Sequence, residues 1–124
     1  MERLDELAKL VLRDLSGDEV VDGPTVSYLP GECEGYVEVL IADSAGMACG
    51  FTVNTAEGDR GVLYALADKI SDAFVELYSV GLPVVPGTHR PAVPAITDDV
   101  VVWKDPNNGD GWSCPVGEYR QGRA

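Results

Sequence analysis

The sequence contains no apolar run long enough to span a membrane, for which about 20 consecutive residues are needed. Residues 1–15, MERLDELAKLVLRDL, are charged from the second position and have no uninterrupted apolar core, unlike a signal peptide. Internal repeats and low-complexity segments are also absent. We therefore expect a soluble cytoplasmic protein, and its 124 residues suffice for one domain with a single hydrophobic core.

Cysteine and histidine are scarce: the chain has three cysteines, Cys33, Cys49 and Cys114, and one histidine, His89. An odd number of cysteines without a close pair argues against a secreted disulfide framework, so we expect reduced thiols. Structural zinc sites usually take their ligands from close pairs such as C-x2-C, and none is present. A metal or Cys–His site that uses His89 with Cys33 or Cys114 is the alternative functional hypothesis, and it requires proximity in space.

Residues 105–111, DPNNGDG, have the composition of a calcium-binding loop but lack its register. The EF-hand loop needs oxygen ligands at positions 1, 3 and 5, Gly at 6 and Glu at 12. Placing Gly111 at position 6 puts Pro106 at position 1 and Gly117 at position 12. The segment therefore predicts a turn, and we expect the protein to bind no metal or other cofactor.

Basic residues are also few, and no lysine or arginine occurs between Arg13 and Arg60. Nine basic residues stand against 21 acidic ones, giving a net charge of -12 and a pI near 4.2. Phosphate backbones and anionic membranes repel such a chain, which argues against nucleic-acid and membrane partners. A surface of one sign promotes solubility, and it would also attract a basic protein partner.

The segment Leu63–Tyr78 has the apolar periodicity of an amphipathic helix. Its apolar stripe contains Leu63, Leu66, Ala67, Ile70, Ala73, Phe74 and Leu77. Three acidic residues four apart, Asp68, Asp72 and Glu76, lie on the opposite face, where like charges cost about 0.2–0.5 kcal/mol per pair. We predict that these three residues and Glu38 bind the basic partner. We also expect Asp59 to cap this helix.

The remaining periodicities predict one further helix and five strands. A stripe of Leu4, Leu7, Ala8, Val11 and Leu15 indicates a helix over Glu2–Leu15. Alternation predicts strands, and proline or glycine clusters predict connections. The expected strands are Thr25–Leu29, Tyr36–Ala42, Met47–Asn54, Val100–Trp103 and Trp112–Tyr119; a proline-rich connector occupies 82–97, and residues 120–124 form a tail.

This order, helix, three strands, helix and two strands, predicts a single α+β domain over residues 1–124. The hairpins make the first three strands an antiparallel meander, and both helices can pack on its apolar face. The expected architecture is a two-layer sandwich of helices on one antiparallel sheet.

The segment that begins LPVVPGTHRP, followed by VVVWKDP and PVGEY, resembles the tail of a group of uncharacterised actinobacterial proteins. The pattern in that group is Cys-Pro-x-His-x-x-Pro, then Trp-x-Cys-Pro. His89 is the counterpart of the histidine, one position further along the chain, whereas Val85 and Asp105 stand where the two cysteines would be. If the group binds zinc there, the resemblance implies that this chain has lost the site.

The small size, low pI and element order are also similar to those of the acidic chaperones of specialised secretion systems. Those proteins form dimers that hold an extended segment of a client, so the resemblance also implies a homodimer of this chain. Their final helix has no counterpart in PVGEYRQGRA, which is short and rich in glycine. Together with the charge, this resemblance implies a non-catalytic binding module, chaperone-like or inhibitor-like, for a basic protein segment.

Overall fold

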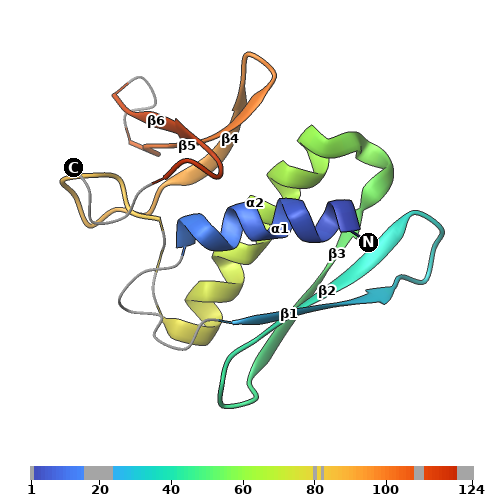
Figure 1. Cartoon of the computed structure of the whole chain (residues 1–124). Helices are drawn as coiled ribbons and strands as arrows, with labels where there is room; N and C mark the ends of the chain where they lie inside the picture. Colours follow the sequence, from blue (N-terminus) through green and yellow to red (C-terminus); the bar gives the residue numbers. More distant parts are fainter. Residues whose placement is uncertain (1, 16–23, 80, 82, 108–110, 120–124) are drawn as a thin grey trace.

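A computed structural model describes residues 2–15, 24–79, 81, 83–107 and 111–119. These residues form two α-helices, a short 3-10 helix and two three-stranded antiparallel sheets, so the fold is α+β (Figure 1). The elements are α1 (Glu2–Leu15), β1 (Thr25–Pro30), β2 (Tyr36–Ala42), β3 (Ala48–Asn54), η1 (Thr55–Glu57), α2 (Gly58–Tyr78), β4 (Val93–Thr97), β5 (Val100–Lys104) and β6 (Ser113–Pro115). The predicted link over 18–23 and the tail over 120–124 lie outside the described residues.

The first sheet is the predicted meander, in the order β1-β2-β3. Its β2–β3 turn is stabilised by Asp43, whose Oδ1 accepts hydrogen bonds from the backbone N–H groups of Ala45 and Met47, both at 2.9 Å. Gly46 takes a positive φ of 90°, which glycine adopts without steric cost. Strand β3 begins one residue later than expected, so Met47 lies before it and is 65% exposed.

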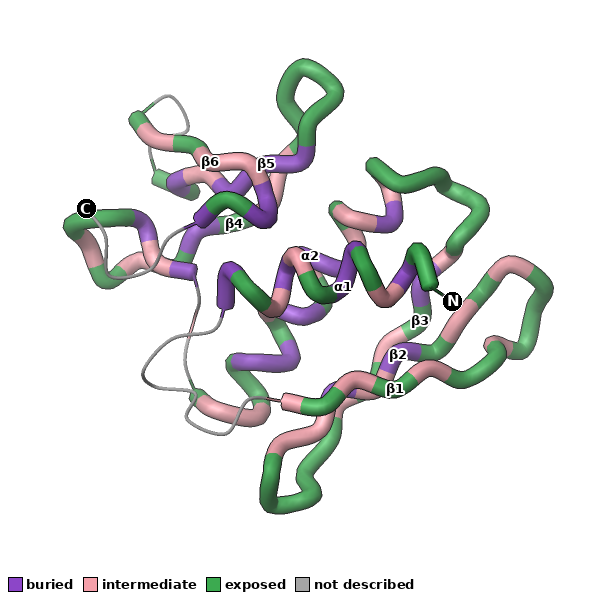
Figure 2. The backbone as a smooth tube through the Cα atoms, viewed as in Figure 1, coloured by how far each residue is buried: buried purple, intermediate pink, exposed green. Residues whose placement is uncertain are grey.

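The predicted core is confirmed. Leu66, Ile70 and Phe74 of α2 are fully buried, at 0% exposure. They belong to one buried cluster with the inward residues of the first sheet, and Figure 2 shows this buried band along the helices and the strands beneath them. The sheet contributes Val39, Ile41 and Val53 from the buried set, with Val37, Phe51 and Cys49 packed partly buried against it. The predicted stripe of α1 is buried in the same cluster.

The start of α2 differs from the prediction. The helix begins at Gly58, after the η1 turn, and Asp59 lies in its first turn instead of capping it. Asn54 caps η1, because its side-chain oxygen accepts a hydrogen bond from the Ala56 N–H at 3.0 Å. The Asp59 carboxylate instead accepts two hydrogen bonds from the Arg3 guanidinium, at 2.9 and 2.7 Å, and so joins α2 to α1.

The second sheet, in the order β4-β5-β6, was not predicted as a separate sheet, so the expected two-layer sandwich with one sheet matches the structure only in part. Helix α2 contacts strands of both sheets, and Figure 1 shows the helices between them. The proline-rich segment 82–97 contains β4, which pairs along its length with β5. Asp98 and Asp99 both take a positive φ, of 52° and 65°, which matches the tight hairpin turn that joins these strands. The expected strand Trp112–Tyr119 is reduced to β6.

Within the described residues, neither helix combines the length and apolar character that a membrane crossing requires.

Candidate functional site

A hollow of about 340 Å³ lies between α2 and β3 and contains two of the predicted partner-binding residues. Its lining residues are Cys49, Gly50, Phe51, Lys69, Asp72, Ala73 and Glu76. Asp72 and Glu76 are exposed and one helical turn apart, so their carboxylates can reach one ligand. Phe51 is partly buried and provides an apolar surface beside them. The hollow therefore combines an apolar floor, two carboxylates and the Lys69 ammonium.

The other two predicted residues lie elsewhere. Asp68 is half-buried on α2, one turn before Asp72, and does not line the hollow. Glu38 alternates with the inward-facing Val37 and Val39 along β2, so it lies on the outer face of the first sheet, away from the helices. There it lines a different hollow, with Cys33 and Thr52 among its neighbours. The structure therefore divides the predicted acidic residues between two surfaces.

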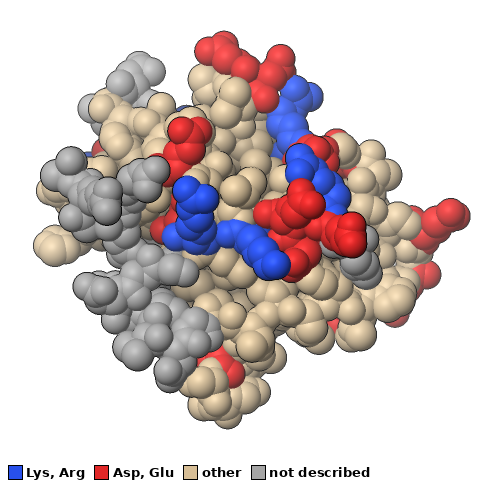
Figure 3. Space-filling model, in the orientation of Figure 1, with Lys and Arg blue, Asp and Glu red and all other residues tan. Residues whose placement is uncertain are grey.

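The face that carries α1 is more balanced in charge. Figure 3 shows lysine and arginine side chains interleaved with aspartate and glutamate over this face. Arg3 pairs with Glu6 and Asp59, at 2.9 and 2.7 Å. Similar pairs join Lys9 to Asp5 at 2.9 Å and Arg60 to Asp99 at 2.6 Å. The hydrogen bond from Lys9 and the bond from Tyr28 lower the pKa of Asp5 below its ordinary value. The acidic excess is therefore concentrated away from this face, including on α2 and the outer face of β2.

Asp14 near the end of α1 is a buried carboxylate that the sequence analysis did not single out. Its exposure is 0%, and its oxygens accept hydrogen bonds from Trp103 Nε1 at 2.8 Å and from the backbone N–H groups of Gly117 and Tyr119. Burial raises the pKa of this carboxyl above its ordinary value, although the three hydrogen bonds oppose the shift. All three partners lie in or after the second sheet, so Asp14 joins α1 to the C-terminal part of the fold. The sequence signal for the burial of Asp14 was its position on the apolar stripe of this helix, three residues after Val11.

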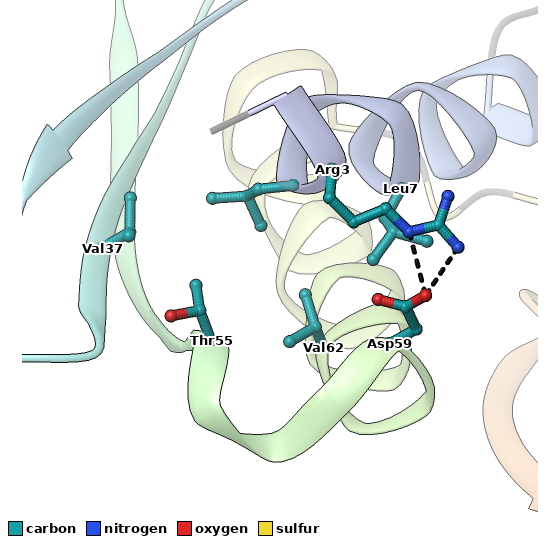
Figure 4. A pocket seen from close by; sticks show the side chains of 7 residues that line it. Arg3, Leu7, Val37, Thr55, Asp59 and Val62 are labelled. Atoms are coloured by element: carbon teal, nitrogen blue, oxygen red, sulfur yellow. Dashed lines mark hydrogen bonds and ion pairs between the residues drawn. The ribbon is translucent and has the colours of Figure 1, made fainter.

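An apolar pocket of about 290 Å³ lies between the first turns of α1 and α2 (Figure 4). Leu4 and Leu7 of α1, Val37 of β2 and Val62 of α2 form its apolar walls. At its rim the Arg3 guanidinium donates two hydrogen bonds to the Asp59 carboxylate, as the dashed lines in Figure 4 show. This pairing satisfies both charged groups.

The structure does not assemble the alternative Cys–His site. Cys33 lies in the β1–β2 loop, and His89 lies in the loop of residues 85–90; Figure 1 places these two loops at opposite ends of the molecule. Cys114 lies in β6, and burial, Asp14 and Glu118 raise the pKa of its thiol, which disfavours the reactive thiolate. Across the described ranges, no three His, Cys, Asp or Glu side chains gather closely enough to hold a metal ion.

The two residues that stand at the cysteine positions of the actinobacterial pattern have other roles. Val85 is buried in the core, with 4% exposure. Asp105 is also buried, and it accepts hydrogen bonds from the Arg90 guanidinium at 2.8 Å and the Asn107 N–H at 2.9 Å. The motif Trp-x-Cys-Pro itself occurs at Trp112–Pro115, which contains Cys114. His89, between these segments, is exposed.

We expect the purified protein to carry no stoichiometric zinc or calcium, because neither ligand spacing is satisfied in the sequence. Elemental analysis after dialysis measures this directly, with a His89→Ala variant purified in parallel. One equivalent of zinc in the parent and none in the variant would contradict the prediction and favour the alternative site.

Comparison of the chain with protein-family models, curated proteins and solved structures found no match.

Proposed function

We propose that this protein is a non-catalytic binding module, chaperone-like or inhibitor-like, for a basic segment of another protein. The observation that carries the proposal is the hollow between α2 and β3, where Asp72 and Glu76 are exposed beside a partly buried aromatic ring. A lysine or arginine side chain has the complementary form, since its aliphatic stem packs on apolar surface while its charged head stays at the carboxylates. The net charge of -12 adds long-range attraction for a basic partner.

Because the attraction in this exposed hollow is electrostatic, we expect the affinity for the basic partner to depend strongly on the salt concentration. The screening length of water falls from about 30 Å at about 0.01 M salt to about 3 Å at about 1 M. The α1 face does not compete for the partner to the same extent, because ion pairs with Arg3, Lys9 and Arg60 already occupy carboxylates there. The α2–β3 hollow is therefore the surface on which substitutions should have the larger effect.

The test is a titration with a synthetic peptide of about eight residues that alternates lysine and valine. We expect saturable binding that weakens as salt rises, and no binding of the matching glutamate–valine peptide. Replacing Asp68, Asp72 and Glu76 together with lysine should weaken binding about tenfold or more, which is about 1.4 kcal/mol. Calorimetry at low and high salt measures both effects.

A matched variant separates the local site from the total charge. Replacing Glu32, Glu34 and Glu118 with lysine changes the net charge by the same amount, but at exposed positions in the β1–β2 loop and after β6. We expect this variant to bind within about threefold of the parent, because its substitutions lie outside the hollow. Equal losses in the two triple variants, or affinity independent of salt, would contradict the proposed site.

A further inference from the structure

We infer that the basic segment binds as an added β-strand along the free edge of β3. This inference rests on the proposed function and names the way in which the partner is held. The occupant is an extended segment of another protein that carries lysine or arginine at alternate positions. Three observations support it: the absence of proline in β3, the direction of its backbone groups and the position of the acidic hollow.

The described strands present four sheet edges, and β3 is the one whose strand contains no proline. The edge strands are β1 and β3 of the first sheet and β4 and β6 of the second. Pro30 lies in β1, Pro94 in β4 and Pro115 in β6. Proline removes a backbone donor, and edge prolines and edge charges are common protections against pairing with another chain. The β3 sequence, ACGFTVN, has neither proline nor a charged residue.

The backbone of β3 presents unpaired donors and acceptors at this edge. Hydrogen bonds at the two ends of the β2–β3 ladder run from Asp43 N to Met47 O at 2.9 Å and from Thr55 N to Gly35 O at 2.7 Å. Antiparallel ladders alternate between bonded and non-bonded pairs. The register therefore directs the N–H and C=O groups of Gly50 and Thr52 away from β2. Both residues are exposed, so these groups are accessible to a new strand.

The side chains around the edge fit an alternating basic segment. Residues of an added strand point alternately to the two faces of the sheet. On the helix face they would meet Phe51, Asp72 and Glu76 of the hollow, which suits a lysine or arginine. On the outer face they would meet Leu40 and Glu38, since a Cβ on Gly50 would be 2.9 Å from Leu40 Cδ2 and 3.9 Å from Glu38 Oε1. This face suits a small or apolar residue.

A second copy of this chain is a less favourable occupant. Pairing β3 with β3 would bring together two chains that each carry a net charge of -12. It would also place the acidic residues of both α2 helices near the same edge. A basic segment avoids this repulsion and adds positive charge beside Asp72 and Glu76, so charge complementarity favours it over self-association.

Amide hydrogen exchange tests the strand directly, with the alternating lysine–valine peptide as the probe. In the free protein the amides of Gly50 and Thr52 should exchange faster than those of Phe51 and Val53, which the ladder pairs with β2. Saturating peptide should slow exchange at Gly50 and Thr52 by about tenfold or more. Unchanged exchange at both amides with bound peptide would overturn the strand-addition inference.

Backbone substitutions complete the test. A probe N-methylated at every second residue, on the edge that would face β3, should bind at least about tenfold more weakly than one methylated on the opposite edge. Thr52→Pro should weaken binding similarly, whereas Thr52→Ala should not. Equal affinities of the two methylated probes would overturn strand addition, whether or not Thr52→Pro folds.

The outcomes separate this inference from the proposed function. If the triple lysine variant of α2 loses affinity while N-methylation has no effect, the acidic site stands and strand addition fails. If the parent does not bind the unmodified probe, both fail. Slow exchange at Gly50 and Thr52 in the peptide-free protein, together with a dimer in sedimentation, would assign the edge to a second copy and overturn the inference.

Discussion

Replacing Asp14 with alanine should lower the free energy of unfolding by about 3–5 kcal/mol, the cost of breaking a buried charged network from one side. The substitution removes the acceptor of the Trp103 Nε1–H bond and of the backbone N–H groups of Gly117 and Tyr119. Each buried donor left without a partner costs about 1–3 kcal/mol, and relief from burying the carboxylate offsets part of the sum. Urea denaturation of the parent and the variant measures the difference.

The isosteric variant Asp14→Asn is the informative control. All three partners of Asp14 are donors, and an amide replaces one acceptor oxygen with a further donor. This variant should therefore be destabilised less than Asp14→Ala. It should be destabilised more than Arg13→Ala, which serves as an exposed control because Arg13 lies in the same helix with its side chain in solvent. A loss below about 1 kcal/mol in Asp14→Ala would contradict the role assigned to the carboxylate.

The same carboxylate should give the stability a component that depends on pH. Burial raises the pKa of Asp14 above its ordinary value of 3.8, so the folded state holds this proton more tightly than the unfolded state does. The stabilisation linked to this proton, a part of the total contribution of Asp14, is therefore fully present below pH 3.8 and is lost as pH rises through the raised pKa. The unfolding free energy of the parent minus that of Asp14→Asn should therefore decline as pH rises above 3.8. An increase would contradict the direction of the shift.

Replacing Phe74 with alanine should cost about 3–5 kcal/mol, enough to unfold a marginally stable domain. Phe74 is fully buried in α2, and its ring packs against Tyr78 with a centroid distance of 5.2 Å. Truncation leaves a cavity where the helix meets the first sheet, because the surrounding side chains can collapse only partly.

The neighbouring residue Val75 provides the matched control, because it lies in the same helix turn but is 52% exposed. Val75→Ala should change the unfolding free energy by less than about 0.5 kcal/mol. Thermal and urea denaturation compare the two variants. Similar stability of Phe74→Ala and the parent would contradict the assignment of the core.

The first sheet and the helices were predictable because their residues repeat with a clear period. The leucine stripe of α1 and the alternation of Val37, Val39 and Ile41 define buried faces without reference to other segments. The second sheet was predicted only in part, because strands were expected at Val100–Trp103 and Trp112–Tyr119 but β4 gave no such signal. Pro94 disfavours a strand in isolation, but at a sheet edge its missing N–H costs nothing, so β4 forms despite it.

The site was only partly predictable for a similar reason. Helical spacing predicted that Asp72 and Glu76 lie one turn apart on the same face of a helix, and the structure places both in one hollow. It could not show that β3 would lie beside them with a free edge, because that depends on how the sheet packs against α2. Nor could alternation along β2 show that Glu38 faces away from this hollow, since that requires knowing which face the helices cover.

A heteronuclear correlation titration with the alternating lysine–valine peptide at low salt tests the central claim most directly. We expect the chemical-shift changes to concentrate in β3 and along α2 from Lys69 to Glu76, and we expect added salt to reverse them. Changes centred instead on Glu32, Glu34 and Glu38, or spread over all exposed carboxylates without a focus on β3, would contradict the proposed binding site.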